Sequence, residues 1–407
     1  MTTVVFVAPF FLDTTVRFLA SAAGLPGVRL ALLSQDPVDR LPADIRSRLV
    51  GHVRLHDGLD AQQIADGVRA LARGTGGRVD RLVGALEQLQ VQLAEVRELL
   101  RIPGMGVETA HNFRDKARMK SVLREHGVPC ARHRLAAGRE DALAFVREVG
   151  FPVVAKPPAG AGGKETHRID RPEQLEQLFG FAPPAPERPV LFEEFVLGEE
   201  HSFDAVTIHG RPVWHSLSRY FPAPLEVLEN PWIQWCVVVP REVEDPRYDD
   251  IRDVAARAVH ALGMRTGLTH MEWFRRRDGS IAVSEVGARP PGAQFTTLMS
   301  YANDFDLYRA WARLMIFDAF DPPERKFAAG AAYLRGQGQG HVKAIHGLDV
   351  AQREIGPLVV EVRLPEAGQP SSGSYEGEGY VIVKHPDTEV VFRALRRLIE
   401  VVRVEMG

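Results

Sequence analysis

The sequence is poor in cysteine, in excess charge and in long apolar runs. Its 407 residues include two cysteines, Cys130 and Cys236, which lie far apart and form no metal or redox motif. So few cysteines suit a reducing compartment, and we predict a cytoplasmic location. The net charge of −3 gives no general case for binding nucleic acid or an anionic membrane. No apolar run approaches the ~20 residues that a membrane-spanning helix needs.

The N-terminal segment lacks the features of a signal peptide. MTTVVFVAPFFLDTT has no basic region before its short apolar run, so we interpret it as a buried first strand. The length favours roughly two to four domains. A chain that is 45% hydrophobic and 25% charged has the ordinary composition of a soluble globular enzyme.

Strands and helices alternate over residues 1–105. TTVVFVAPF, GVRLALLSQD and HVRLHD read as strands, and TTVRFLASAAG and AQQIADGVRALARG as helices. This alternation predicts a doubly wound α/β unit. Residues 80–104 carry apolar side chains at helical spacing and end in Pro-Gly, which predicts a helix there. Strands and one last helix after residue 326 predict a small α+β domain over residues 326–407.

The segment from His270 to Gly292 reads as a β-hairpin whose turn is Asp278-Gly279. With that dipeptide as the tip, Glu272 faces Glu285. Facing like charges destabilise a strand pair, so the pair needs a compensating cation. Mg²⁺ prefers oxygen and is often held by one or two carboxylates plus substrate phosphates. Two alternatives stay open: a different register, or surface charges paired with the neighbouring arginines.

AKPPAGAGGKET supplies groups that suit phosphate. Lys156 ends a buried strand, and a loop with Gly160, Gly162 and Gly163 follows it. Glycines let backbone N–H groups approach phosphate oxygens, and the lysine adds a point charge. The order G-x-x-x-x-G-K-[ST] is absent, so this is no P-loop. A plain glycine-rich turn between strands is the alternative.

PVLFEEFVLGEE ends an apolar strand in two pairs of glutamates. Adenine is often bound by one backbone carbonyl, one backbone N–H and an apolar wall, and ribose hydroxyls suit a carboxylate. The segment from Glu193 to Glu200 could supply all of these. A strand end with a charged turn is the alternative.

The order of these motifs resembles the ATP-grasp superfamily over most of the chain. It runs from a lysine-bearing helix through Lys156 and its loop and the Glu-Glu segment to two carboxylates on adjacent strands. The resemblance implies a Rossmann-like domain over residues 1–105 and an ATP-grasp fold over residues 106–325. It also implies a lid subdomain over about residues 135–205 and ATP bound between lid and base.

The resemblance also implies roles for individual residues. Lys116 and Lys156 would bind phosphate, and Gly160, Gly162 and Gly163 would lie in the flexible phosphate loop. The adenine hinge would be Glu193, Glu194, Phe195 and Val196, and the ribose ligand Glu200. Glu272 and Glu285 would hold two Mg²⁺ ions, which Mn²⁺ can replace. Arg289 would contact the transferred phosphate, so Arg289 and Lys156 are the predicted catalytic residues.

The chain departs from the family pattern at residue 287. The family often reads E-x-N-x-R, with Asn as a third metal ligand, but this chain reads Glu285-Val286-Gly287-Ala288-Arg289. Gly287 has no side chain to bind a metal, so water or another residue must complete the shell, or the second ion is held more loosely. Lys164 and Thr166 also differ from the commoner ending of the loop.

Within the superfamily, FPVVAKPPAGAGG, EEFVLGEEHSFD and EVGARPPGAQ resemble L-amino acid ligases and related ATP-dependent carboxylate–amine ligases. The resemblance implies amide formation through an acyl phosphate, with release of ADP and phosphate. It implies amino acids as the carboxylate and amine substrates, and a homodimer. His270, Arg219 and Gln294 are further candidates for contact with substrate. Trp232 and Trp235 also lie in this region, but plain aromatic packing is the stronger interpretation of either.

Two alternatives to amide formation between amino acids stay open. One is an ATP-grasp carboxylase or purine-pathway ligase that acts on bicarbonate or formate. The chain has no biotin-attachment motif of the Met-Lys-Met type, but a carrier can be a separate protein. The other is a nucleotide-binding module without catalysis, which only the loss of Asn at residue 287 favours.

Overall fold

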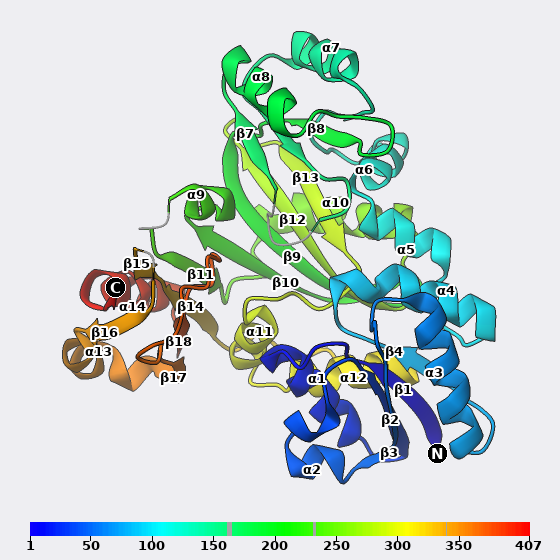
Figure 1. The fold of residues 1–407 in the computed structure, drawn as a ribbon. Coiled ribbons are helices and arrows are strands. Elements are labelled where there is room, and N and C mark those ends of the chain that lie inside the picture. The colour runs from blue at the N-terminus through cyan, green and yellow to red at the C-terminus, as the bar shows by residue number, and fades with distance from the viewer. Residues whose placement is uncertain (161–164, 231–232, 339) are drawn as a thin grey trace.

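The computed structural model describes residues 1–160, 165–230, 233–338 and 340–407. Its elements form three lobes (Figure 1), with the N-terminal residues, residues 133–194 and the C-terminal residues each in a lobe of their own. Gly162, Gly163, Lys164 and Trp232 lie outside the described residues. Among the described helices, none combines the length and the apolar composition that crossing a membrane requires.

The N-terminal lobe is built on a four-stranded parallel sheet of order β3-β2-β1-β4, as the alternating pattern predicts. Its elements are β1 (Thr2–Val7), α1 (Asp13–Ala23), β2 (Val28–Ser34), η1 (Val38–Arg40), α2 (Ala43–Arg46), β3 (Leu49–Arg54), α3 (Ala61–Gly74) and β4 (Arg81–Val83). The 3-10 turn η2 (Glu87–Leu89) and α4 (Gln90–Leu100) follow.

The single helix predicted over residues 80–104 is wrong over residues 80–89. Residues Arg81–Val83 form β4, which pairs with β1, and the α-helix begins only at Gln90. The apolar side chains there fit both periods, and pairing with a buried strand decides between them. The segment between β4 and α4 therefore holds Glu87 after the strand, where it contacts Arg289.

A small antiparallel sheet of order β5-β8-β6-β7 forms the lobe over residues 133–194. Two helices cover it, and apolar side chains of both are buried against the strands. The elements are β5 (His133–Ala136), α7 (Arg139–Val149), β6 (Val153–Lys156), β7 (His167–Ile169), α8 (Pro172–Phe181) and β8 (Val190–Glu194). The helices α5 (Val107–Arg114) and α6 (Lys116–Glu125) lead into it.

The largest sheet has eight strands in the order β13-β12-β9-β10-β11-β14-β18-β17. Its elements and their connections are β9 (Gly198–Ile208), β10 (Arg211–Phe221), α9 (Pro224–Glu229), β11 (Trp235–Val239), η3 (Pro246–Tyr248), α10 (Asp249–Ala261), β12 (Gly267–Arg276), β13 (Ile281–Gly287), β14 (Ala328–Leu334), β17 (Val359–Arg363) and β18 (Gly379–His385). Because β14 pairs with β11, the strands β14, β18 and β17 continue this sheet, whereas the remaining strands after residue 326 form a separate three-stranded sheet.

The remaining elements close the C-terminal lobe and join the lobes. They are α11 (Phe295–Asn303), α12 (Leu307–Phe317), β15 (Gly336–Gln337), β16 (Val342–His346), α13 (Leu348–Ile355), η4 (Gly356–Leu358), α14 (Thr388–Val401) and β19 (Arg403–Met406). One hydrophobic cluster extends from β1 and α1 through α11 and α12 to β14 and β18. The N-terminal lobe and the large sheet thus share buried apolar surface.

The centre of this shared cluster is aromatic. Phe18 on α1 is 2% exposed. Its ring centroid lies 4.7 Å from those of Tyr308 and Trp311 on α12. Arranged aromatic pairs add to the free energy of burial, so this contact ties the first lobe to the rest of the chain.

We expect Phe18→Ala to lower the free energy of unfolding by about 3–5 kcal/mol, because it opens a cavity between two packed elements. Chemical denaturation measures the loss. Phe181→Ala is the matched control, since Phe181 is 63% exposed, and it should change stability by no more than about 0.5 kcal/mol. Equal losses in the two variants would contradict the assignment of Phe18 to a shared core.

Candidate active site

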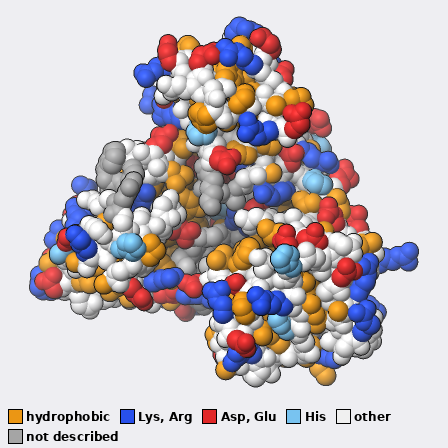
Figure 2. Space-filling view, viewed as in Figure 1, with side chains coloured by type: hydrophobic (Ala, Val, Ile, Leu, Met, Phe, Trp, Pro, Cys, Tyr) orange, Lys and Arg blue, Asp and Glu red, His pale blue; other side chains and the backbone are white. Residues whose placement is uncertain are grey.

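A cavity of about 210 Å³ lies where the lobe of residues 133–194 meets the large sheet and the C-terminal lobe. The space-filling view shows the hollow between the lobes (Figure 2). Most of the residues singled out from the sequence line it: Lys116, Lys156, Gly160, Glu193, Glu194, Phe195, Val196, Glu200, His270, Glu272, Glu285 and Arg289. The fold thus brings to one place residues that are up to 173 positions apart (289 − 116).

The hairpin between β12 and β13 has a three-residue loop, so the predicted two-residue turn is wrong. Arg276 N donates to Ser280 O at 2.8 Å, and Gly279 N donates to Arg276 O at 2.9 Å. Asp278 Oδ1 accepts a hydrogen bond from Ser280 N at 3.0 Å, which favours the longer loop. Gly279 adopts the positive φ of 85° that the turn requires.

A bulge then restores the predicted pairing of the two carboxylates. Next to the loop, Trp273 pairs with Val283, and this register would set Glu272 opposite Ser284. The register shifts by one residue between Glu272 and Trp273, so that Glu272 faces Glu285. An extra residue in one strand re-aims the side chains beyond it, and bulges of this kind are common beside active sites.

Lys116 is the counter-ion of one of the facing carboxylates. It is the first residue of α6, whose N-terminus is capped by the Asp115 side chain through Ala117 N and Arg118 N. Its Nζ donates to Glu285 Oε1 at 2.7 Å and to Gly160 O at 3.1 Å. One lysine therefore connects the carboxylate pair to the start of the glycine-rich loop.

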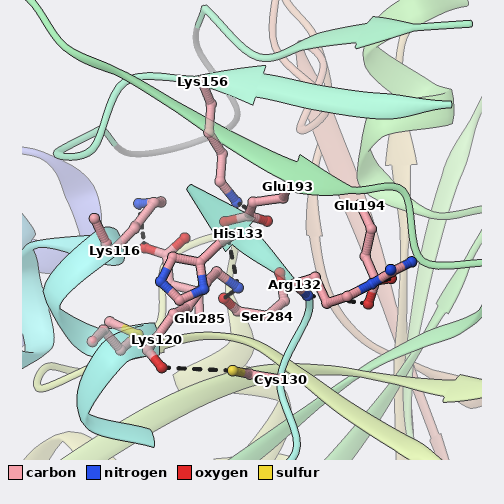
Figure 3. A network of polar contacts seen from close by, with 12 residues as sticks. Lys116, Lys120, Cys130, Arg132, His133, Lys156, Glu193, Glu194, Ser284 and Glu285 are labelled. Atoms are coloured by element: carbon pink, nitrogen blue, oxygen red, sulfur yellow. Dashed lines mark hydrogen bonds and ion pairs between the residues drawn. The ribbon is translucent and has the colours of Figure 1, made fainter. Parts of the chain in front are cut away.

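Two further lysines flank Glu193 (Figure 3). Lys156 Nζ lies 3.0 Å from Glu193 Oε2, and Lys120 Nζ lies 3.4 Å from Oε1. Lys120 is fully buried and also donates to Ser284 O at 2.7 Å. The carboxylate proposed for the adenine hinge thus orients two cations, and Lys120 holds the backbone of the bulge.

The electrostatic environment separates the two facing carboxyl groups. Burial and the nearby Glu285 charge raise the pKa of Glu272. Burial acts in the same direction on Glu285, but Lys116 and Lys156 outweigh it and lower the pKa of Glu285. Burial and the Glu272 charge also raise the pKa of Glu200 to about 8. The positive groups near Glu272 therefore do not outweigh burial and the Glu285 charge, and a cation would stabilise the ionised form of Glu272.

The donor set fits a magnesium ion that is shared with phosphate. Glu272 and Glu285 face each other across the hairpin. Over the described residues, no group of three or more His, Cys, Asp or Glu side chains is placed to hold a metal. Two carboxylates alone suit Mg²⁺, which usually keeps waters and substrate phosphates as its other ligands.

The hinge segment is held from both sides. Glu194 Oε2 accepts from Arg132 Nε at 2.7 Å, and Glu194 Oε1 accepts from Arg276 Nη2 at 2.7 Å. The backbone N–H of Glu194 donates to Arg132 O, and that of Phe195 donates to Pro152 O. These contacts fix the backbone along one wall of the cavity, next to the apolar side chain of Val196.

His270 is bound to an acid that the sequence did not single out. Its Nδ1 lies 2.8 Å from Oδ1 of Asp204, a fully buried residue of β9. Its Nε2 lies 4.0 Å from Glu272 Oε1, and its ring packs edge-on against Phe295. The alternation of side chains in β12 places His270 on the same face as Glu272. The pair with Asp204 orients the imidazole toward the cavity.

Arg289 is anchored by another unexpected residue. Its Nε donates to Oε2 of Glu87 at 2.5 Å, and its Nη1 donates to Pro290 O at 3.1 Å. Burial acts against the charge of Arg289, but Glu87 and then Glu285 outweigh it and raise its pKa. Arg289 is therefore a fixed cation at the cavity wall.

Two of the predicted substrate residues are not among those that line the cavity. Arg219 lies with its guanidinium over the rings of Phe221 and Phe392, and 3.9 Å from Glu199. Gln294 is buried, and its Oε1 accepts a hydrogen bond from Thr297. Packing at the end of β10 and at the first turn of α11 accounts for both positions.

The end of the cavity away from the hinge is aromatic and apolar. Trp235 stands at its centre, 4.8 Å from Tyr375 and 5.7 Å from Tyr220 between ring centroids. The indole N–H of Trp235 is buried and makes no hydrogen bond within the described part of the chain. Phe295 and the side chains of α9, Pro224, Leu225 and Leu228, complete this end.

Sequence reasoning could have reached some of the missed residues. Lys120 lies one turn after Lys116 on the same face of a helix, and this spacing is visible in the sequence. Asp204 is an acid within an apolar strand. Glu87 had no local signal, because 202 positions separate it from Arg289.

The comparison with protein families shows which domain holds this site. The model described as the ATP-grasp domain matches residues 121–305. The chain contains an ATP-grasp domain. The predicted resemblance to the ATP-grasp superfamily is thereby confirmed. The lysines and carboxylates described above lie within or just before this domain, whereas Glu87 lies in the preceding lobe.

Individual known proteins also resemble this chain, one in sequence and one in structure. An L-arginine-specific L-amino acid ligase of Bacillus subtilis is 24% identical over 246 residues, which are 59% of this chain and 59% of that protein. The chain therefore aligns with less than two thirds of this relative. The crystal structure of an L-amino acid ligase from Bacillus licheniformis has a TM-score of 0.78 at 19% identity, covering 100% of this chain and 99% of that one.

A third comparison concerns a different reaction. The structure of N5-carboxyaminoimidazole ribonucleotide synthetase from Thermotoga maritima has a TM-score of 0.72 at 20% identity and covers 100% of both chains. At these identities the structural likeness shows the ATP-grasp fold, and it confirms the mixed α/β architecture with its parallel N-terminal sheet. The predicted domain boundaries, the homodimer and the cytoplasmic location stay predictions.

The two facing carboxylates should affect stability with opposite signs. At pH 8 we expect Glu272→Gln to raise the thermal midpoint of the metal-free protein by roughly 1–3 °C, because it removes a charge whose ionisation the fold disfavours. Glu285→Gln should lower the midpoint, because the pKa of Glu285 is depressed by Lys116 and Lys156.

The pH dependence follows from the same shifts. A carboxyl with a raised pKa costs stability increasingly as the pH rises from its unfolded to its folded pKa, and one with a lowered pKa stabilises fully above its unfolded pKa and loses this as the pH falls through its folded pKa. The Glu272 difference should therefore shrink as the pH falls toward about 4, and the Glu285 difference should shrink only as the pH falls below about 4. Thermal unfolding at several pH values with a chelator present measures them. Shifts of the same sign at pH 8 would contradict the assigned environments.

Proposed function

We propose that this protein is an ATP-dependent carboxylate–amine ligase that forms an amide through an acyl phosphate and releases ADP and phosphate. One observation carries the proposal: a single cavity joins facing carboxylates and converging lysines to a separate apolar end. The first part suits the phosphates of ATP, and the second suits an organic substrate.

The lysines and the hinge assign the nucleotide end. Lys116 and Lys156 neutralise the phosphates, and the segment of Glu193, Glu194, Phe195 and Val196 holds the adenine, with Glu200 for the ribose. Glu272 and Glu285 hold the magnesium, which when bound neutralises and orients the phosphoryl groups. Lys116 pairs with Glu285 in this structure. Once Glu285 holds the magnesium, the ammonium group of Lys116 can bind the phosphates instead. Gly160, which lines the cavity, lies beside them.

The reaction conserves atoms in two transfers. A carboxylate oxygen of the first substrate attacks the γ-phosphorus, and the bond from that phosphorus to the β-γ bridging oxygen breaks to release ADP. The amine nitrogen of the second substrate then attacks the acyl carbon and loses a proton, and phosphate leaves. Arg289 stabilises the negative charge that develops on the phosphoryl and acyl oxygens.

Exclusion of water is part of the same proposal. An acyl phosphate hydrolyses readily, so the reacting carbon has to be shielded until the amine arrives. The lobe of residues 133–194 covers the cavity on one side and the C-terminal segment with Tyr375 closes it on another. His270 faces the space between Glu272 and the apolar end, where it contacts the substrates.

The apolar end favours amino acids with an apolar or aromatic side chain for at least one substrate. Trp235, Tyr220, Phe295 and the leucines of α9 offer hydrophobic surface. Bicarbonate or formate would leave this surface unused. A carboxylase or purine-pathway reaction stays the second candidate because of the structural likeness to the ribonucleotide synthetase.

We expect Mg²⁺-dependent phosphate release from ATP only when a carboxylate and an amine are both present. A panel of single amino acids, amino acid pairs, bicarbonate and formate tests this, with mass spectrometry for a product equal to the sum of both substrates minus water. Release with bicarbonate or formate alone would move the protein to the second candidate. ATP binding without release across the whole panel would favour a nucleotide-binding module instead.

Arg289→Ala and Glu285→Gln should separate two roles. Arg289→Ala should lower the turnover number by about 100-fold or more, as removal of a charge-stabilising group does, and leave the Kd for ATP nearly unchanged. Glu285→Gln should abolish turnover and reduce the dependence of ATP affinity on Mg²⁺. Kinetics and calorimetry measure both. Equal losses of turnover and ATP affinity in Arg289→Ala would contradict its assignment.

A further inference from the structure

The space beside Gly287 is filled by a side chain from another lobe. A Cβ added to Gly287 would lie 3.1 Å from Oε2 of Glu87 and 3.7 Å from Nε of Arg289. The Glu87 carboxylate thus occupies the position toward which a side chain at residue 287 would extend. The absence of a side chain at residue 287 leaves the space that the Glu87 carboxylate occupies.

Glu87 reaches this position from outside the ATP-grasp domain. It belongs to the 3-10 turn η2, directly after β4 of the N-terminal sheet, and it is 8% exposed. Its Oε2 accepts from Nε of Arg289 at 2.5 Å. A buried carboxylate in contact with a partly buried guanidinium is coupled to it, because loss of the arginine leaves the buried charge without compensation.

The contact determines which edge of Arg289 is available. Glu87 binds Nε, and the carbonyl of Pro290 binds one N–H of Nη1, so the N–H groups of Nη2 and the second N–H of Nη1 remain to donate to an incoming oxygen. A guanidinium held at two of its nitrogens cannot rotate about its long side chain. Positional errors of the order of 1 Å at a reacting group can reduce turnover about 100-fold.

We propose that Glu87 is a positioning residue for the ligase reaction: it holds Arg289 in its working orientation, in the space that the absent side chain of residue 287 leaves. The proposal rests on the proposed function, because Arg289 is the group through which Glu87 acts. It also makes the N-terminal lobe part of the active site.

The test uses the full-length protein and the substrates that support phosphate release. Glu87→Ala should lower the turnover number by about 10- to 100-fold, as misplacement of a reacting group does, and leave the Kd for ATP within about twofold. On an Arg289→Ala background, Glu87→Ala should cause no further loss, because both changes act through one group.

Rescue separates positioning from a merely structural role. Gly287→Asn alone should impair turnover, since its Cβ would crowd the Glu87 carboxylate. In the double variant Glu87→Ala with Gly287→Asn, the amide oxygen of the new Asn can accept a hydrogen bond from Arg289 Nε. The turnover number of the double variant should therefore be about tenfold higher than that of Glu87→Ala alone. A role in stability alone predicts no such recovery of turnover.

Arg81→Gln is the matched control. Arg81 pairs with Asp318 at 3.1 Å, so this change also breaks an ion pair between the N-terminal lobe and the rest of the chain, but away from Arg289. Its turnover should stay within about twofold of wild type, as for a partly exposed ion pair. A loss equal to that of Glu87→Ala would overturn the proposal, as would a Glu87→Ala variant with unchanged turnover.

The two proposals can fail separately. Active wild type with an unaffected Glu87→Ala variant rejects the role of Glu87 and leaves the ligase intact. If wild type shows no release with any substrate, the proposed function fails, and thermal midpoints of Glu87→Ala, Arg289→Ala and the double variant then decide the contact. Non-additive midpoint losses support the coupling of Glu87 to Arg289, and additive losses overturn it.

Discussion

Two carboxylates that face each other across a hairpin are the constraint on which this site depends. Glu272 and Glu285 are neighbours only because a bulge re-aims the strand beyond it. Their repulsion has to be offset, and among the described residues Lys116 pairs directly with one of them, at 2.7 Å from Glu285. The other keeps a raised pKa and a demand for positive charge. A cation bound here would stabilise the ionised form of Glu272.

The buried charges around this pair connect the lobes. Glu193 and Lys156 come from the small sheet, Lys120 from α6, and the backbone of Ser284 from the large sheet, and all are in contact within one network. Charges of this kind are costly to bury unless each is paired, so their mutual position is tightly determined. The ion pair of Arg289 with Glu87 connects the N-terminal lobe to the site in the same way. The cavity therefore depends on packing between lobes, which the aromatic cluster around Phe18 provides.

The accuracy of the sequence predictions depended on how local their cause was. Nearby side chains set three features that the sequence predicts correctly. They are the alternation of strands and helices in residues 1–105, the strand that ends in Lys156, and the apolar strand before Glu193. The apolar spacing of residues 81–83 fits both a helix and a strand, and only pairing with β1 decides for the strand. The predicted pairing of Glu272 with Glu285 is right although the predicted turn is wrong. The longer loop shifts the strand register by one residue, and the bulge shifts it back.

By itself, the sequence determined which chemistry is available: carboxylates on adjacent strands, lysines before them, and a glycine-rich loop, in the order of the ATP-grasp domain. Motif order survives without coordinates because each motif is local and chain connectivity preserves the order. Only the tertiary structure decided which partners these groups take. The contacts of Glu87 with Arg289, of Asp204 with His270 and of Lys120 with Glu193 join residues 202, 66 and 73 (193 − 120) positions apart. Contacts at such separations arise from packing of whole lobes, and no periodicity within a segment records them.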